Sequence, residues 1–370
     1  MIYIDNYISL KELKACILDI NYNLIRTINL DIKKDKIEID YNNDCYLYFM
    51  FDDKKSEIVR LSKNIFRLVL KYNEKTKSND IYLDVNNYKY KEVIVLTLKD
   101  EKNLFFREDK EKIINILLPK DYNENKKYGV IIMFDSQNIY DLNKVGKYTL
   151  KNDPYGGWQV DVSLSSISEL TNNEYIVVGI EDADYYREIE LTPSRKKFEY
   201  NKLLYDLKEE KLLLGELDYF GDFINETVLP YISSNYSVNL DELGIVGSSC
   251  GGLASFYLGL RDYKQYKFIF TFTPATGFIK KESLVEFYRS IDFIKNKEHL
   301  PYIFYYQGKK GMLEELLYNL NKELIDTLYL EGYQKELIDS YIEESAEHNE
   351  TMWRYGFNYA IMKYIEKRGK

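Results

Sequence analysis

The chain has 370 residues, 45% of them hydrophobic, with 60 acidic and 51 basic side chains and a formal net charge of −9. This length suits two domains, or one large α/β domain with an appendage. An acidic chain whose lysines lie in short runs beside acids, as in DDKKSE, is a poor candidate for binding nucleic acid, which needs clustered positive charge.

The three cysteines, Cys16, Cys45 and Cys250, form no CxxC pair. An odd and scattered set argues against a disulfide scaffold and a structural zinc site. No stretch approaches the roughly 18 apolar residues of a membrane span. The opening residues lack the basic and apolar regions of a signal peptide. We therefore expect a cytoplasmic protein without a membrane partner, and the sequence leaves its oligomeric state open.

The first hundred residues alternate short apolar runs with polar turns, a pattern typical of β-strands. Ahead of most of these runs, SLKELKACILDI (9–20) has the pattern of a helix capped by Ser9, with Glu12 three residues on. Together these elements predict a small β-rich, sandwich-like domain over residues 1–105. The predicted strands are 36–41, 45–51, 65–72, 80–85 and 92–98.

From residue 106 onward, near-continuous apolar strands alternate with longer helical segments. This alternation predicts an α/β domain over residues 106–370, with a mostly parallel sheet and helices on both faces. The predicted strands are 112–119, 128–135, 175–180, 243–248, 267–273 and 301–306, and the predicted helices are 160–170, 220–236, 252–263, 312–332 and 349–368.

A strand, a sharp turn and a helix are predicted over LGIVGSSCGGLASFYLGL (243–260), and the turn contains the pattern G-x-S-x-G. A nucleophilic serine in this pattern sits in a strained turn, where side chains two residues before and after it would collide. Ser249 has glycine at both of these positions, Gly247 and Gly251. Cys250 would then give its backbone N–H to an oxyanion hole. A structural or phosphate-binding glycine turn would match the same letters.

A serine hydroxyl is a poor nucleophile until a base takes its proton, and histidine is the usual base. The chain has two histidines, His299 and His348. His299 precedes a predicted strand, whereas the sites of α/β proteins gather at the carboxyl ends of strands. His348 lies between two predicted helices near the C-terminus, which matches the order of serine before histidine in α/β-hydrolases. We therefore predict His348 as the general base.

Several segments in this order resemble the Putative esterase family (esterase D and enterochelin-esterase-like) of the α/β-hydrolases. They begin with INILLPKDYNENKKYGVIIMFDSQNIYD and continue through GGWQVD, YIVVGIED, REIELTP and FINETVLPYISSNYSV to the GSSCGGLASFYLGL turn and HNETMWRYGF. The resemblance covers about residues 110–368. It implies a serine esterase with no metal and no organic cofactor, acting on a small-molecule ester.

The resemblance also implies roles for the turn that follows the 128–135 strand. The second oxyanion donor would be the backbone N–H of Ser136 or Gln137, with glycine usual in the family at the position of Ser136. Asp135, Asn138 and Trp158 would shape this turn and the substrate pocket, although purely structural roles fit them equally well.

The acid that would orient His348 is harder to place. The family often has a carboxylate after the sixth strand, but here Gly308 is followed by Lys309 and Lys310. Glu314 is the nearest acid, a few residues late. The alternative is a Ser–His dyad in which a carbonyl group or water orients the ring. Loss of the acid in a serine protease lowers kcat about 10⁴-fold, so something must hold the histidine.

The leading hypothesis is therefore an esterase that forms an acyl-enzyme on Ser249, with His348 as base and then acid. An acyltransferase using the same site, or a non-catalytic binding protein on the same scaffold, would fit many of the same features. For residues 1–105 the sequence leaves two roles open, a structural cap and a module that recognises the substrate.

Overall fold

A computed structural model describes residues 2–4, 11–31, 33, 36–37, 45–51, 54–56, 58–61, 67–73, 78–85, 88–102, 104, 110–140, 157–194, 196–201 and 215–369. The chain forms two compact units. The first comprises Met1–Lys91, Asn138–Glu174 and Asn349–Lys370, and the second comprises Glu92–Gln137 and Tyr175–His348. The first unit thus takes in two segments from beyond residue 106, where the sequence alone suggested a division near residue 105.

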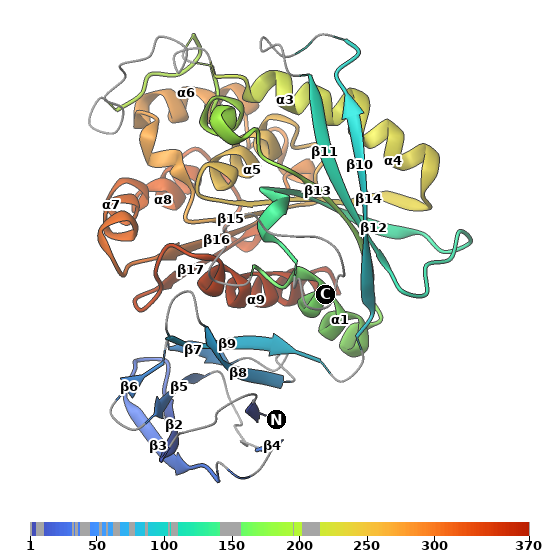
Figure 1. Cartoon of the computed structure of the whole chain (residues 1–370). Helices are drawn as coiled ribbons and strands as arrows, with labels where there is room; N and C mark the ends of the chain where they lie inside the picture. Colours follow the sequence, from blue (N-terminus) through green and yellow to red (C-terminus); the bar gives the residue numbers. More distant parts are fainter. Residues whose placement is uncertain are drawn as a thin grey trace. The chain divides into compact units, whose positions relative to one another are not determined.

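The first unit contains two small sheets (Figure 1). In one, the strand order is β4-β1-β8-β9; β1 pairs in parallel with β8, and the other neighbours are antiparallel. The other has the order β3-β2-β5-β6, with β7 also paired to β5, and is antiparallel. The β-rich prediction is therefore confirmed. The strands are β1 (Ile2–Ile4), β2 (Leu13–Leu18), β3 (Leu24–Asn29), β4 (Lys36–Ile37), β5 (Cys45–Phe51), β6 (Lys54–Lys55), β7 (Val59–Leu61), β8 (Arg67–Asn73) and β9 (Ser78–Asp84).

The helix predicted over residues 9–20 is wrong, because the described part of this segment is strand β2. Leu13, Ala15 and Ile17 alternate along it and are buried. The strand has a hydrogen-bonded neighbour on each side, β3 and β5, and pairing of this kind overrides a weak local helix preference. Ser9, the predicted cap, lies outside the described residues.

Two helices from later in the chain complete the core of the first unit, α1 (Val160–Thr171) and α9 (Glu350–Arg368). Val162 of α1 and Tyr355 of α9 belong to the same buried cluster as the strand residues Leu47, Phe49 and Leu70. The N-terminal strands therefore share one core with two helices from much later in the chain.

Polar contacts link the same segments. Gln159 forms a reciprocal pair with the backbone of Leu83: its Oε1 accepts from the Leu83 N–H at 2.7 Å and its Nε2 donates to the Leu83 carbonyl at 3.1 Å. Arg354, which is fully buried, donates to the carbonyl oxygens of Ile81 at 2.9 Å and Gly157 at 2.7 Å. Each bond satisfies a backbone group that would be costly to bury alone.

The second unit contains an eight-stranded sheet of order β10-β11-β13-β12-β14-β15-β16-β17 (Figure 1). The six strands from β13 to β17 in this order are parallel, and β11 is antiparallel to β13. The mostly parallel sheet that the sequence predicted is thus confirmed. The strands are β10 (Tyr90–Lys99), β11 (Glu111–Pro119), β12 (Tyr128–Phe134), β13 (Tyr175–Ile180), β14 (Val238–Ser248), β15 (Phe268–Phe272), β16 (Tyr302–Gly308) and β17 (Ile338–Glu343).

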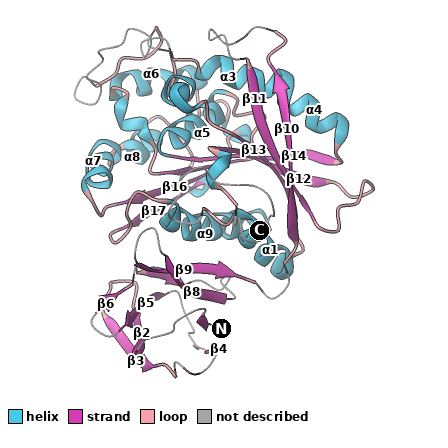
Figure 2. Cartoon of the chain, viewed as in Figure 1, coloured by secondary structure: helices cyan, strands magenta, loops and turns pink. Residues whose placement is uncertain are grey.

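The helices of the second unit come after strands β13 to β16 along the chain. Figure 2 draws the helices in cyan and the strands in magenta. The single helix predicted over 312–332 is two helices, interrupted where the Asn321 side chain turns to bond the Pro274 carbonyl at 2.6 Å. Strand β17 and helix α6 had no sequence prediction. The helices are α2 (Arg187–Glu190), α3 (Leu217–Phe223), α4 (Leu229–Asn235), α5 (Ser249–Arg261), α6 (Lys281–Ile291), α7 (Met312–Asn321) and α8 (Leu324–Leu330), with a π-helical turn, Ile224–Val228, between α3 and α4. Within the described residues, no helix combines the length and the apolar character that a membrane crossing would need.

Candidate active site

Ser249 lies at the junction of β14 and α5, in a sharp turn. Its φ is 54°, in the left-handed region that a residue with a side chain rarely adopts. A Cβ on Gly247 would lie 2.2 Å from the carbonyl oxygen of Gly251, so the two glycines permit the close approach that the turn requires. The predicted strand, turn and helix are thus present, with Ser249 at the carboxyl end of a central parallel strand.

Cys250 follows Ser249 and is buried in the first turn of α5. Burial raises the pKa of its thiol, although the nearby guanidinium of Arg187 opposes this effect. A raised pKa keeps the sulfur in its neutral and less nucleophilic form. The backbone N–H groups of a first helical turn have no acceptor within the helix. The geometry therefore suits Cys250 as a backbone donor, rather than as a nucleophile.

His348 and Glu314 are brought together although 34 positions separate them. The Nδ1 atom of His348 lies 3.1 Å from Oε1 of Glu314. Glu314 is in the first turn of α7, which follows β16, and His348 follows β17. His348 therefore lies between a strand and a helix, and the prediction that it lies between two helices is wrong. Because β14, β16 and β17 are parallel, all three site residues follow the carboxyl ends of strands in one sheet.

The Glu314 carboxylate is buried and accepts hydrogen bonds from two further side chains. Thr273 Oγ1 donates to Oε1 at 3.0 Å, and Gln307 Nε2 donates to Oε2 at 2.8 Å. A Cβ on Gly308 would lie 2.8 Å from Cδ of Glu314, so this glycine leaves the space that the carboxylate fills. The acid reaches the position beside His348 from a helix instead of from the turn directly after β16.

Lys309 and Lys310, which stand where the family often has its acid, pair with carboxylates of the segment after β17. Lys309 Nζ lies 2.6 Å from Glu344 and Lys310 Nζ lies 2.7 Å from Glu347. Both pairs are at the surface, where such contacts contribute little to stability. His299 is exposed on a short 3₁₀ turn before β16, as predicted for a histidine outside the site.

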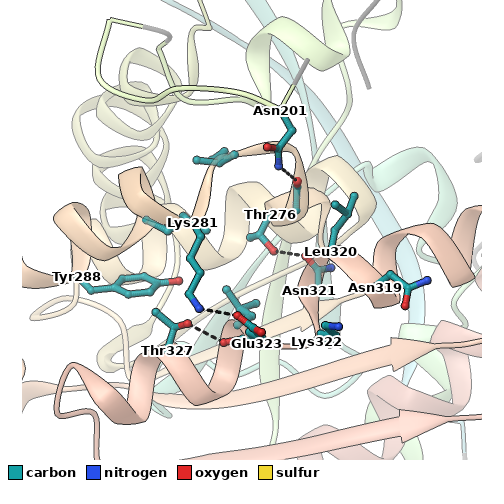
Figure 3. A pocket seen from close by; sticks show the side chains of 14 residues that line it. Asn201, Thr276, Lys281, Tyr288, Asn319, Leu320, Asn321, Lys322, Glu323 and Thr327 are labelled. Carbon is teal, nitrogen blue, oxygen red and sulfur yellow. Dashed lines mark hydrogen bonds and ion pairs between the residues drawn. The ribbon is translucent and has the colours of Figure 1, made fainter. Parts of the chain in front are cut away.

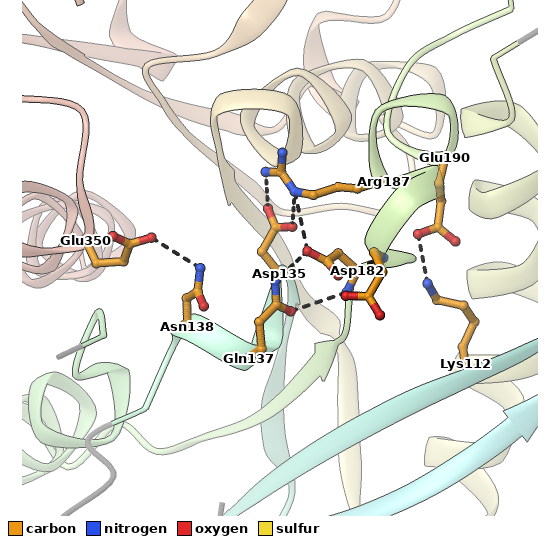
Figure 4. A network of polar contacts seen from close by, with 9 residues as sticks. Lys112, Asp135, Gln137, Asn138, Asp182, Arg187, Glu190 and Glu350 are labelled. Atoms are coloured by element: carbon orange, nitrogen blue, oxygen red, sulfur yellow. Dashed lines mark hydrogen bonds and ion pairs between the residues drawn. The ribbon is translucent and has the colours of Figure 1, made fainter. Parts of the chain in front are cut away.

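The turn after β12 holds Asp135, Ser136 and Gln137. Its left-handed residue is Asp135, with φ of 55°. The Ser136 hydroxyl is buried and accepts a hydrogen bond from Asn115 at 2.7 Å, which accounts for a side chain where the family usually has glycine. The Gln137 amide donates to Asp182 at 2.7 Å (Figure 4). Both side chains are thus held by hydrogen bonds to neighbouring residues, and their backbone N–H groups remain the predicted oxyanion donors.

No role was predicted for Arg187, which lies at the start of α2. Its guanidinium forms a bidentate pair with Asp135, at 2.6 Å from Nε to Oδ1 and 2.8 Å from Nη2 to Oδ2 (Figure 4). Burial alone would lower the pKa of Arg187, but the charge of Asp135 outweighs it and the net pKa is raised well above its usual value. The only signal in the sequence was the arginine of REIELTP, a segment that carried the resemblance.

The same pair adjoins the turn that holds Ser249. A Cβ on Gly251 would lie 2.8 Å from Oδ2 of Asp135, so the carboxylate sits directly above this glycine. Helix α2 is itself held by a buried ion pair between Lys112 of β11 and Glu190, at 2.8 Å. The Asp135–Arg187 pair therefore connects the predicted oxyanion turn to a fixed helix and keeps it against the turn of α5.

Asn138 and Trp158, which were predicted to shape the pocket, belong to the first unit. Asn138 donates to Glu350 at 3.2 Å, and the ring of Trp158 packs against Trp353 with centroids 5.6 Å apart. Their role in a pocket stays a prediction. Among the described residues, no group of three or more His, Cys, Asp and Glu side chains is arranged to hold a metal ion.

Comparison with known proteins places the chain in a family. Residues 109–362 match the family described as Putative esterase. No curated protein matches the chain.

Solved structures of the same fold include a BES protein from Bacillus cereus, with 17% identity, a TM-score of 0.52 and coverage of 77% of this chain and 95% of that one. Another is the siderophore hydrolase EstA from Aspergillus nidulans, with 14% identity, a TM-score of 0.53 and coverage of 74% and 95%. A ferulic acid esterase has 16% identity, a TM-score of 0.51 and coverage of 76% and 99%. At these identities the likeness shows the fold, while the family match covers more than half of the chain. The chain therefore belongs to the Putative esterase family, as its sequence suggested, and is a carboxylic ester hydrolase.

Proposed function

We propose that the chain hydrolyses its ester through an acyl-enzyme on Ser249. The Oγ atom of Ser249 attacks the carbonyl carbon while Nε2 of His348 takes the proton. The backbone N–H of Cys250, with that of Ser136 or Gln137, holds the negative charge on the carbonyl oxygen. His348 then protonates the departing alkoxide and activates the water that releases the acid.

The observation that carries this proposal is the pair of His348 and Glu314, 3.1 Å apart, in the same unit and at the same end of the sheet as Ser249. In this arrangement Glu314 is the third member of a triad. A carboxylate on Nδ1 orients the ring and stabilises the imidazolium that forms when Ser249 loses its proton. The burial of Glu314 and its three donors favour this role over a solvated surface acid.

Labelling with a fluorophosphonate probe tests the nucleophile. The wild type and the matched variant Ser248→Ala should be labelled, and Ser249→Ala should not. Cys250→Ala should keep its label, because the proposed contribution of Cys250 comes from its backbone. An unlabelled wild type would favour a non-catalytic binding protein on this scaffold, and labelling that survives in Ser249→Ala would reject the assignment of the nucleophile.

For the substrate we propose an acyl ester of a sugar, or a phenolic or siderophore-like ester. The support is that structures of the same fold carry the names siderophore hydrolase and ferulic acid esterase. Rates on acetylated sugars, methyl ferulate and a catecholate siderophore would choose among these classes. Adding an alcohol or thiol acceptor and measuring the ratio of transfer to hydrolysis separates an acyltransferase from an esterase.

A further inference from the structure

Next to the pair of His348 and Glu314, the second unit contains a line of buried polar side chains that begins at Glu314. Gln307, the penultimate residue of β16, donates to Oε2 of Glu314 at 2.8 Å. The Oε1 atom of Gln307 lies 3.3 Å from Nδ2 of Asn321, the last residue of α7. Gln307 is fully enclosed and Asn321 is 2% exposed. The two amide side chains form a hydrogen-bonded series that ends at the Glu314 carboxylate. Their burial calls for an explanation, because a buried amide is costly unless its polar atoms are hydrogen-bonded.

The orientation of each amide is fixed by a backbone carbonyl, which can only accept hydrogen bonds. Asn321 Nδ2 lies 2.6 Å from the carbonyl oxygen of Pro274, so the NH₂ group must be on that side. Its Oδ1 then accepts from the hydroxyl of Thr276 at 2.8 Å, on the wall of a cavity of about 250 Å³ (Figure 3). Gln307 Nε2 lies 2.9 Å from the carbonyl oxygen of Gly308, which fixes the second amide independently.

With both amides oriented, every bond in the line runs in one direction. Asn321 donates to Gln307 Oε1, which also accepts from the hydroxyl of Tyr305 at 3.0 Å. Gln307 in turn presents an N–H to Oε2 of Glu314, so a proton on that oxygen would meet a donor instead of an acceptor. The contact with Gln307 therefore disfavours a proton on Oε2, and a Glu314 side chain with no proton on either oxygen can only accept from His348.

We propose that Gln307 and Asn321 are positioning residues which, through Glu314, hold His348 in the tautomer with its proton on Nδ1. This tautomer leaves the lone pair of Nε2 free to act as the base. The proposal rests on the catalytic role given to His348 above. Its physical content, the position of one proton, can nevertheless be measured without any substrate.

The test is the tautomer of His348 in long-range ¹H–¹⁵N NMR spectra of the full chain. The chain has two histidines, and the exposed His299 can be removed as His299→Asn to assign the signals. In Gln307→Glu an acid replaces the N–H donor at nearly constant shape, so the two facing carboxyl groups must share a proton. Gln307→Met removes the donor without adding charge, and it carries the test if Gln307→Glu does not fold.

We expect the Nδ1–H form of His348 in the wild type and a mixture of tautomers in both Gln307 variants. The kcat of these variants should fall about 10- to 100-fold, as for the loss of a hydrogen bond to a charged group, with KM changed less than about twofold. Asn321→Asp should shift the tautomer in the same direction by a smaller amount. The matched control Asn319→Asp makes the same change on the exposed face of α7 and should alter neither quantity.

If His348 keeps the Nδ1–H form in both Gln307 variants, the proposal is overturned, whatever the activity. An unchanged tautomer in Asn321→Asp removes Asn321 from it. A tautomer that responds as expected in a protein that hydrolyses no ester would leave the inference standing and reject the proposed function.

Discussion

A methyl group on Gly308 would lie 2.8 Å from the carboxyl carbon of Glu314, closer than two carbon atoms approach without a clash. The same methyl group would lie 2.7 Å from the carbonyl oxygen of Ala346. Neither neighbour can yield easily, because one is backbone and the other is the buried carboxylate beside His348. The missing side chain of Gly308 is therefore a condition for the contact between Glu314 and His348.

We predict that Gly308→Ala displaces Glu314 and lowers kcat by about 10- to 100-fold, the cost of weakening a hydrogen bond to a charged group. Steady-state hydrolysis of a p-nitrophenyl ester measures it. Gly311→Ala is the control: its methyl group would meet nothing within 4 Å, but its φ of 91° is strained for alanine. With its ψ of 157°, Gly311 lies in a region that essentially only glycine adopts, so Gly311→Ala should lower the free energy of unfolding by about 1–3 kcal/mol and leave kcat unchanged. A Gly308→Ala enzyme of normal kcat would contradict the prediction.

Variants of two adjacent glutamates can distinguish a Ser–His–Glu triad from a Ser–His dyad. Glu314 is buried beside His348, whereas Glu315 is exposed on the same helix. If Glu314 is the orienting acid, Glu314→Gln should lower kcat by about 10³- to 10⁴-fold, as loss of the acid does in serine proteases. Glu315→Gln should change kcat less than twofold. Similar kcat values for the two variants would instead support a dyad.

Some parts of this site could be predicted from the sequence and others could not. The turn at Ser249 is local, since the glycines at 247 and 251 are required within five residues of chain. Glu314 depends on distant geometry: it reaches His348 because Gly308 leaves space and because Thr273 and Gln307 supply donors. Glycine spacing therefore points to a candidate nucleophile, but cannot identify a candidate acid whose partners lie in or after three different strands.

Other features that were not predicted also depend on contacts between distant segments of the chain. Arg187 meets Asp135 across 52 positions, and no pattern in either segment predicts their pairing. The residue pattern of strand β2 is typical of a short helix, but the segment forms a strand because β3 and β5 pair with it on both sides. The parallel strands of the large sheet were predictable, because each is a nearly continuous apolar run, which is the pattern of a strand buried on both faces.

Asp182 should make stability depend on pH. Burial, and then the negative charge of Asp135, raise the pKa of Asp182. The folded protein thus holds this proton more tightly than the unfolded chain, where the pKa of an aspartate is about 3.9. Stability contributed by this group is present at low pH and is lost as pH rises from there through the raised pKa.

Asp182→Asn removes the ionisable group, and with it the stability that is lost when Asp182 ionises. The variant should therefore be more stable than the wild type at pH 7, by up to about 1 kcal/mol. The gain should shrink as the pH falls toward 3. Urea unfolding at several pH values measures both quantities, with the exposed Asp184→Asn as the control from the same loop. A gain that grew on acidification would show that the sign is wrong.

Gln159 should be important for the stability of the first unit. Gln159→Leu leaves the buried N–H of Leu83 without its side-chain acceptor, which should cost about 1–3 kcal/mol of unfolding free energy. Gln334→Leu, which removes a surface bond to Lys297, should cost less than about 0.5 kcal/mol. Equal effects of the two variants in urea unfolding would show that the reciprocal pair with Leu83 contributes little.

The bond from Arg354 to the carbonyl of Ile81 spans 273 positions. On the ribosome, where a chain emerges at about 5–20 residues per second, the strands of the first unit are made early. The helix that supplies Arg354 is made about 270 residues later than Ile81. Those strands must therefore wait, with apolar faces uncovered, until residues 350–368 have been made. We expect a nascent chain stopped before residue 349 to be held by chaperones, and a chain that includes residues 350–368 to be free of them.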